Sequence, residues 1–210
     1  MSPLDNFIEI KKKAYLLNPN IKIIIVCKNQ EITNILPILN SGHREFGENK
    51  IQEAKKKWTN VSNSYDNLKL HFIGKLQSNK VEEAILNFRF IHSLDSKKLA
   101  EEIHRIQIKK DIFREYFIQI NLANEVQKSG APLEQAENFI DYCKIDLKLN
   151  IVGLMCIPPV NKNPSFFFNL LANLAKSKKL SFLSMGMSSD YIEAIKCGAT
   201  HIRLGSAIFN

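Results

Sequence analysis

The sequence predicts an α/β protein whose fold is a single (β/α)8 barrel of the TIM type. Eight short runs of apolar or β-branched residues follow one another along the chain, and the segments between them are long enough for helices. Those segments carry apolar residues at three- and four-residue spacing, as at Leu99, Ile103 and Ile106, which is typical of a helix packed on one face. The eight predicted strands comprise residues 21–27, 43–46, 70–73, 90–93, 115–122, 149–154, 182–184 and 201–204.

The first of these strands indicates how the sheet is built. Ile23 to Val26 would be apolar on both faces, whereas a half-exposed antiparallel strand alternates apolar with polar residues. The strands therefore belong to a parallel sheet that helices cover. Eight of them favour a closed barrel over an open doubly wound sheet, and no GxGxxG motif of a dinucleotide-binding sheet follows the first strand.

The two ends of the chain depart from a regular barrel. A helical segment at residues 3–15 precedes the first strand, and Asn210 comes only six residues after the eighth, which leaves no room for a full helix. We therefore expect an extra N-terminal helix, covering the surface that a complete eighth helix would cover, and a truncated C-terminal helix. No linker rich in Pro, Gly or Ser divides the chain, so one domain at residues 1–210 is predicted.

The composition is that of a soluble globular protein. Of the 210 residues, 45% are hydrophobic and 24% charged, and no apolar run approaches the roughly 20 residues that a membrane span needs. The N-terminal segment carries charges where a signal peptide needs apolar residues, so we expect a cytoplasmic protein without membrane contacts. The four cysteines form no CxxC pair and are predicted to be reduced thiols.

The net charge of +8 raises the question of a polyanionic partner. The lysines are dispersed in short runs within segments of helical period, at residues 11–13, 55–57, 97–98, 109–110 and 178–179. None of these runs carries the interleaved aromatic residues of a single-strand binding surface. We interpret them as solvated helix faces and predict no specific binding of nucleic acid. A polyanion-binding module is a third alternative, behind the two functions described below.

Polar residues follow several predicted strands at the barrel end where functional groups gather. Lys28 comes directly after five apolar residues, so its ammonium reaches the barrel mouth, where partial burial would favour the neutral, nucleophilic amine. On position alone, a lysine that simply extends into water is the commoner case. Two small, donor-rich turns, Met187-Ser188-Ser189 and Gly205-Ser206, indicate a phosphate site, although one serine could merely cap the helix that follows.

Four histidines in or beside strands raise the question of a metal site. They are His43, His71, His92 and His201. The sequence has no HxH or HExxH motif, and the neighbouring carboxylates show no ligand spacing. We therefore predict no metal site and interpret these histidines as hydrogen-bonded residues.

Seven segments together point to a known family. They are IIVCK around Lys28, EFGENKIQEAKKKW from Glu45, HFIGKLQSNK from His71, IHSLDSKKLA from Ile91, QINLANEVQKSG from Gln119, VGLMCIPP from Val152 and LSMGMSSDYIEAIKCGATHIRLGSAIF from Leu183. The motifs FGEN, HFIGxLQxNK and SMGMSxD in this order are highly specific. In these segments the chain resembles the pyridoxal phosphate homeostasis protein family, whose members are single-domain barrels related to the barrel of alanine racemase.

The resemblance implies that the barrel binds pyridoxal 5′-phosphate (PLP). Lys28 resembles the lysine that forms an aldimine with the cofactor, and Arg203 resembles the arginine that faces its pyridine nitrogen. The other implied contacts are Ser188, Gly205 and Ser206 at the phosphate, with Met187 and Asn49 lining the site. Three departures from the family pattern remove none of these contacts: Cys27 replaces Ser or Thr, Gln127 replaces Ser, and the chain ends at Asn210, where relatives continue.

The implied site favours binding over catalysis. An arginine beside the pyridine nitrogen stays protonated and leaves that nitrogen unprotonated, which weakens the ring as an electron sink. Alanine racemase also uses a tyrosine from a separate domain, which we do not expect here, and none of the five tyrosines occupies a predicted strand end. We therefore expect a monomeric protein that takes part in PLP homeostasis and amino-acid balance, and that passes PLP to PLP-dependent apo-enzymes. We expect no robust catalysis and assign no catalytic residues. The alternative is a PLP-dependent amino-acid racemase or related enzyme.

Overall fold

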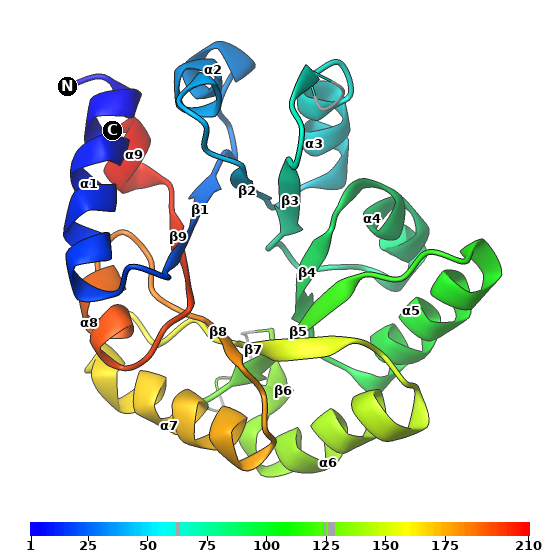
Figure 1. Cartoon of the computed structure of the whole chain (residues 1–210). Coiled ribbons are helices and arrows are strands. Elements are labelled where there is room, and N and C mark those ends of the chain that lie inside the picture. Colours follow the sequence, from blue (N-terminus) through cyan, green and yellow to red (C-terminus); the bar gives the residue numbers. More distant parts are fainter. Residues whose placement is uncertain (62–63, 124, 126–128) are drawn as a thin grey trace.

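The computed structural model, which describes residues 1–61, 64–123, 125 and 129–210, contains a closed barrel of parallel strands (Figure 1). The barrel strands are β1 (Lys22–Val26), β2 (Glu45–Glu48), β3 (Lys69–Phe72), β4 (Phe90–Leu94), β5 (Glu115–Asn121), β7 (Ile151–Met155), β8 (Phe182–Ser184) and β9 (His201–Leu204). β1 pairs with β2 and with β9, and the pairing of β4 with β5 completes the ring. The predicted (β/α)8 barrel is therefore confirmed.

Helices surround the ring of strands. They are α1 (Pro3–Leu17), α2 (Ile32–Asn40), α3 (Ile51–Trp58), α4 (Val81–Asn87), α5 (Lys97–Lys110), α6 (Ala136–Asp141), α7 (Pro164–Ser177), α8 (Tyr191–Lys196) and α9 (Ser206–Phe209). α7 shows why they form: Phe167, Phe168, Leu171 and Leu174 recur at helical spacing and are all buried. Among the described residues, no helix is long and apolar enough to cross a membrane.

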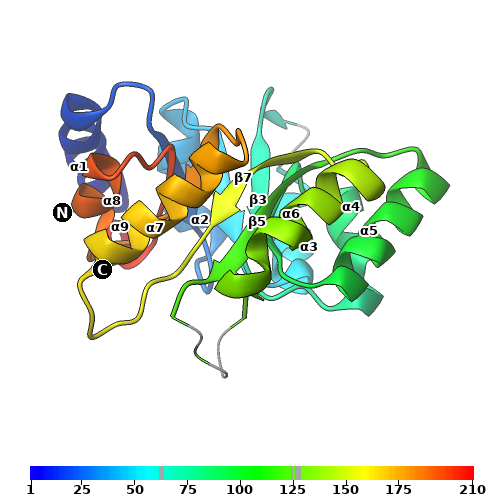
Figure 2. The same ribbon diagram turned by 90° about the horizontal axis from the view of Figure 1, so that it is seen from below.

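The extra N-terminal helix is present and lies where it was predicted. The side chain of Ser2 accepts a hydrogen bond from the Asp5 backbone, the Asp5 carboxylate accepts one from the Ser2 backbone, and Pro3 begins α1. α1 packs against α2, α8 and α9, and the Asn6 side chain donates to the carbonyl of Ile208 in α9 at 2.9 Å. Figure 2 shows α1, α8 and α9 together on one side of the barrel. α1 thus covers the surface beside the short α9.

Two features of the sheet differ from the prediction. β2 begins and ends two residues later than predicted because Gly47 continues the strand, pairing with Val26 and His71. A Cβ at Gly47 would lie 2.8 Å from a methyl carbon of Ile24 in the neighbouring strand β1, so a glycine lets β2 pair here without displacing that side chain. A further short strand, β6 (Ala131–Pro132), pairs with the end of β5 and was not predicted.

The inside of the barrel is partly polar. Aromatic side chains from strands that are not neighbours in the sheet contact one another there. The ring of His201 in β9, for example, contacts the rings of His71 in β3 and Phe117 in β5. A small apolar cluster of Phe90, Phe117 and Met155 shares this interior with buried polar side chains. They include His71, His92, Ser184, His201 and Arg203. Barrel interiors are more commonly filled by branched aliphatic residues.

Candidate functional site

The carboxyl ends of the strands surround a cavity of about 510 Å³. All seven residues predicted to contact a cofactor line it. They are Lys28 after β1, Asn49 after β2, Met187 and Ser188 after β8, and Arg203, Gly205 and Ser206 in and after β9. Since β2, β1, β9 and β8 are consecutive in the sheet, these residues lie on one side of the barrel mouth. The structure thus brings residues from both ends of the chain to one place.

Lys28 presents a free amine to this cavity. Its side chain is exposed, as in the commoner case of a lysine that extends into water. Within the described part of the chain, the ammonium makes no hydrogen bond or ion pair. An amine without an internal partner is available to react with a ligand that enters the cavity.

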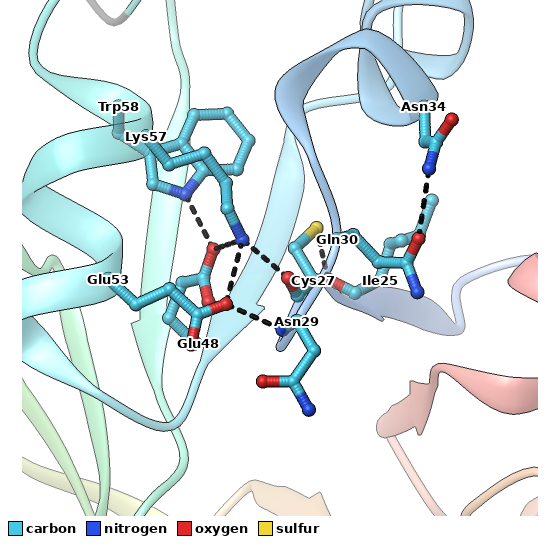
Figure 3. A network of polar contacts seen from close by, with 9 residues as sticks. All are labelled: Ile25, Cys27, Asn29, Gln30, Asn34, Glu48, Glu53, Lys57 and Trp58. Carbon is cyan, nitrogen blue, oxygen red and sulfur yellow. Dashed lines mark hydrogen bonds and ion pairs between the residues drawn. The ribbon is translucent and has the colours of Figure 1, made fainter.

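The strand end that carries Lys28 is held by a buried ion pair (Figure 3). Lys57 of α3 donates to the carbonyl of Cys27 at 2.5 Å and to the carboxylate of Glu48 at 2.9 Å, and Trp58 donates to the same Glu48 oxygen at 2.9 Å. Burial raises the pKa of Glu48, while the hydrogen bonds from Lys57 and Trp58 oppose the shift. Residues 55–57 were predicted to form a solvated face, but the Lys57 side chain is only 6% exposed. We call Glu48, Lys57 and Trp58 the strand-end clamp.

The residue after Lys28 is held as well. Asn29 adopts a left-handed conformation with φ of 57°, and its backbone N–H donates to the carboxylate of Glu53 at 2.5 Å. Figure 3 shows Glu53 reaching from α3 to both Asn29 and Lys57. Lys28 therefore stands between two backbone positions that α3 fixes.

The two donor-rich turns form a single unit. The hydroxyl of Ser188 accepts a hydrogen bond from the backbone N–H of Ala207 at 3.1 Å, which joins the turn after β8 to the start of α9. The N-cap of α8 is Asp190, and its carboxylate accepts from the N–H of Met187 at 2.6 Å. The alternative that Ser188 or Ser189 caps this helix is therefore wrong. The Ser188 and Ser206 hydroxyls line the cavity as possible donors to an anion.

Arg203 supplies a buried cation at the inner wall of the cavity. It is 4% exposed, and its guanidinium donates to the hydroxyl of Ser184 at 2.7 Å and to the carbonyl of Cys156 at 3.0 Å. Burial lowers the pKa of Arg203, but a guanidinium stays protonated in proteins. Its remaining N–H groups can therefore donate to a ligand and cannot accept from one.

Asn49 carries a buried acceptor that lacks a partner. Its side-chain oxygen makes no hydrogen bond with any described residue. Gly74 packs against the Asn49 backbone so closely that a Cβ there would lie 2.1 Å from the Asn49 carbonyl oxygen. An unpaired buried acceptor costs stability unless a ligand or water satisfies it. A free amine, a buried cation, two hydroxyls and this acceptor fit an aldehyde that carries a heteroaromatic ring and a phosphate.

Some wall residues were not singled out from the sequence. They are Val26, Ile73 and Ile157. Ile73 follows β3, and its position at a strand end was the signal that could have found it. Ile157 is in the connection from β7 to α7, where only the three-dimensional structure shows that it reaches the cavity.

The histidines serve hydrogen bonds, as predicted. His43 contacts the carbonyl of Glu45 at 3.0 Å, His201 contacts the hydroxyl of Thr200 at 2.8 Å, and His71 and His92 contact each other. Among the described residues, no group of three or more His, Cys, Asp or Glu side chains is placed to hold a metal ion.

Comparison with known proteins identifies the family. Residues 5–210 match the family model described as the alanine racemase N-terminal domain. A pyridoxal phosphate homeostasis protein from Synechocystis sp. is 38% identical over 202 residues, which cover 92% of each protein. The chain belongs to the pyridoxal phosphate homeostasis protein family.

Solved structures agree with this assignment. The chain is similar to PipY of Synechococcus elongatus without PLP, with a TM-score of 0.87 and 31% identity over 99% of both chains. It is also similar to PipY with PLP bound, with a TM-score of 0.85 and 30% identity over the full length of both chains.

The departures from the family pattern lie away from the cavity wall or outside the described residues. Cys27 is buried, and its thiol donates to the carbonyl of Ile25 at 3.3 Å. The backbone N–H of Asn210 donates to the carbonyl of Ser206 at 3.1 Å. Gln127 lies outside the described residues.

Proposed function

We propose that this protein binds PLP reversibly through Lys28 and takes part in the homeostasis of the free cofactor. The observation that carries the proposal is the cavity at the barrel mouth, where the free Lys28 amine meets all six other predicted contact residues. The family assignment and the PLP bound to PipY support it.

Each group of the cavity has a place in this proposal. The amine of Lys28 condenses with the cofactor aldehyde, and one water leaves; the reverse reaction releases the cofactor. The hydroxyls of Ser188 and Ser206 donate to the phosphate, Gly205 lines the cavity next to Ser206, and Arg203 faces the pyridine nitrogen. Asn49 and Met187 complete the wall beside the ring.

The chemistry of the wall favours storage and delivery over turnover. Bound PLP supplies an electron-withdrawing ring to an amine attached at its aldehyde carbon. Arg203 donates to the pyridine nitrogen and leaves it unprotonated, which limits that effect. Among the described residues of the cavity wall, Lys28 and Arg203 are the ionisable groups, so no second acid–base residue faces Lys28.

Further parts of the proposal concern the protein's setting. We propose that it acts as a single-domain monomer in the cytoplasm and that PLP-dependent apo-enzymes receive the cofactor. The reversible bond to an exposed lysine supports such a transfer, because the cofactor can leave by hydrolysis without a large movement of the barrel.

Uptake and delivery test this proposal together. PLP added to the purified protein is expected to give an absorbance band at longer wavelength than that of free PLP, and an added apo-aminotransferase is expected to gain activity as that band declines. Lys28→Ala should show neither effect. Lys75→Ala is the matched control, because Lys75 is another exposed lysine beside the barrel mouth. A wild-type protein without the band, or with a band that Lys28→Ala keeps, would contradict the proposal.

A further inference from the structure

A chain of hydrogen bonds crosses the barrel interior and ends at Arg203. The carboxylate of Glu45 lies 2.7 Å from His71, whose other ring nitrogen lies 2.9 Å from His92. The second nitrogen of His92 is 2.9 Å from the hydroxyl of Ser184, to which Arg203 donates at 2.7 Å. The five residues come from β2, β3, β4, β8 and β9. We call them the interior chain.

The interior chain spans the barrel from one end to the other. Glu45 is the first residue of β2, at the amino end, where it also pairs with Lys69 at 3.1 Å. Ser184 is the last residue of β8, at the carboxyl end beside the cavity. β4 and β8 are not neighbours in the sheet, so the contact between His92 and Ser184 passes through the interior. His71, His92 and Ser184 are fully buried.

The two ends of the interior chain fix the direction of every hydrogen bond in it. Ionised Glu45 can only accept, so the Nε2 of His71 carries a proton and donates to it. A neutral His71 then accepts at Nδ1, and the Nε2 of His92 donates there. A neutral His92 accepts at Nδ1 from the hydroxyl of Ser184. The oxygen of Ser184 is left to accept from Arg203, which is a donor only.

Burial supports the neutral state of both rings. It lowers the pKa of His71, against the pull of the Glu45 carboxylate, and it lowers that of His92 well below the ordinary value. Each ring also stacks on a phenylalanine, His71 on Phe90 and His92 on Phe117, which fixes the planes of the two imidazoles. The orientation of each member is thus set by packing as well as by hydrogen bonding.

Arg203 depends on this chain for its geometry. Within the described part of the protein, Arg203 forms no ion pair, so no carboxylate fixes its plane. Its position rests on two acceptors, the Cys156 carbonyl and the Ser184 hydroxyl, and only the second can rotate. His92 stops that rotation by accepting the hydroxyl proton. Because the hydrogen bonds of the interior chain all run in one direction and end on the Glu45 carboxylate, the interior chain also favours a cation at its other end.

We propose that Ser184 and His92 are positioning residues that aim the Arg203 guanidinium at the pyridine nitrogen of PLP. The inference rests on the proposed function, because it concerns the cofactor held on Lys28. Neither residue lines the cavity, so each acts on the cofactor through Arg203. If the interior chain only satisfied its own buried polar groups, replacing Ser184 would not change the contact between Arg203 and the pyridine nitrogen.

Ser184→Ala and Ser93→Ala form a matched pair for the test. Both serines are buried, but the hydroxyl of Ser93 makes no hydrogen bond with any described residue. Ser184→Cys is the second variant, since a thiol keeps the shape of the side chain with a somewhat larger atom and is a poor hydrogen-bonding group. The readouts are the ¹⁵N chemical shift of PLP labelled at the pyridine nitrogen, the PLP dissociation constant, and the tautomers of His71 and His92 in cofactor-free protein by ¹⁵N NMR.

The expected outcome separates the four proteins into two pairs. In wild type and in Ser93→Ala, both rings carry their proton on Nε2 and the pyridine signal is that of a hydrogen-bonded, unprotonated nitrogen. In Ser184→Ala and Ser184→Cys, the pyridine signal moves toward that of free PLP, and affinity falls about tenfold. If the wild type fails to bind PLP, the proposed function is wrong. If the wild type binds it and both Ser184 variants keep its pyridine signal and affinity, or if either ring carries its proton on Nδ1, the positioning role is wrong.

Discussion

Replacing Lys57 by methionine is expected to destabilise the fold by about 3–5 kcal/mol, because it leaves the Glu48 carboxylate buried without its cation. The side chains of Lys57 and Glu48 are 6% and 0% exposed, and 2.9 Å separates the charged atoms. At that distance the gross attraction is roughly 6 kcal/mol for an effective dielectric constant of about 20. The cost of removing both charges from water offsets most of that attraction in the intact pair, but the variant retains the cost for Glu48 alone.

A companion variant isolates the charge. In the double variant Glu48→Gln/Lys57→Met the buried position is neutral, and the new amide can still accept from Trp58, so most of the lost stability should return. Lys56→Met is the control, because Lys56 is an exposed neighbour on the same helix and should change stability by no more than about 0.5 kcal/mol.

Urea denaturation measures these differences. The fluorescence of Trp58, the single tryptophan, and the far-ultraviolet circular dichroism should report the same transition. A loss below about 1 kcal/mol in Lys57→Met, or a double variant that is no more stable than the single one, would refute the buried ion pair as the element that holds the Lys28 strand end.

Three further predictions follow from the site and the interior chain. Ser206→Ala should weaken PLP binding about ten- to a hundredfold and leave the melting temperature unchanged, because it removes one charge-assisted hydrogen bond to the phosphate. Equilibrium titration measures the affinity, and an unchanged affinity would mean that the phosphate binds elsewhere. The PLP-loaded protein should exchange and invert Cα of L- or D-alanine in D₂O far more slowly than about 10 s⁻¹, whereas inversion at that rate would favour the racemase alternative. Burial alone would raise the pKa of Glu45, but the hydrogen bond from His71, the charge that His71 gains in acid and then the charge of Lys69 outweigh it and hold the pKa at about 2. Because this pKa lies below that of Glu45 in the unfolded chain, ionised Glu45 stabilises the fold above about pH 4.5, and this contribution is lost as the pH falls toward 2. In acid titrations, the free energy of unfolding of Glu45→Gln should therefore fall less than that of the wild type over this pH range, by up to about 3 kcal/mol.

The fold could be predicted because its signals are local. The apolar runs, such as Ile23 to Val26, and the helical spacing between them each occupy fewer than about 20 residues. The exact limits of β2 could not be predicted, because Gly47 looks like the end of a strand unless its contact with Ile24 of the neighbouring strand β1 is known.

The cavity wall was accessible to sequence reasoning for a similar reason. In a parallel barrel the carboxyl ends of the strands converge, so a residue's position after a strand predicts its place in space. Lys28, Ser188 and Ser206 were found in this way, whereas Arg203, which lies within β9, was implied by the family resemblance.

The strand-end clamp and the interior chain depend on contacts between distant residues. Lys57 follows two exposed lysines, and only the approach of β1 to α3 shows that its ammonium is buried. Glu45, His71, His92 and Ser184 meet because each points inward from a different strand, and their register is set by the whole barrel. Periodicity within one segment carries no information on such a meeting.

The attachment of PLP to Lys28 is tested most directly by trapping it. The protein is incubated with PLP, reduced with sodium borohydride, digested and analysed by mass spectrometry, which locates the pyridoxyl group on a single peptide. We expect one pyridoxyl group per chain, on Lys28, retained in Lys75→Ala and lost in Lys28→Ala. A pyridoxyl group on Lys75 or Lys80 in place of Lys28, or labelling of Lys28→Ala at the wild-type level, would contradict it.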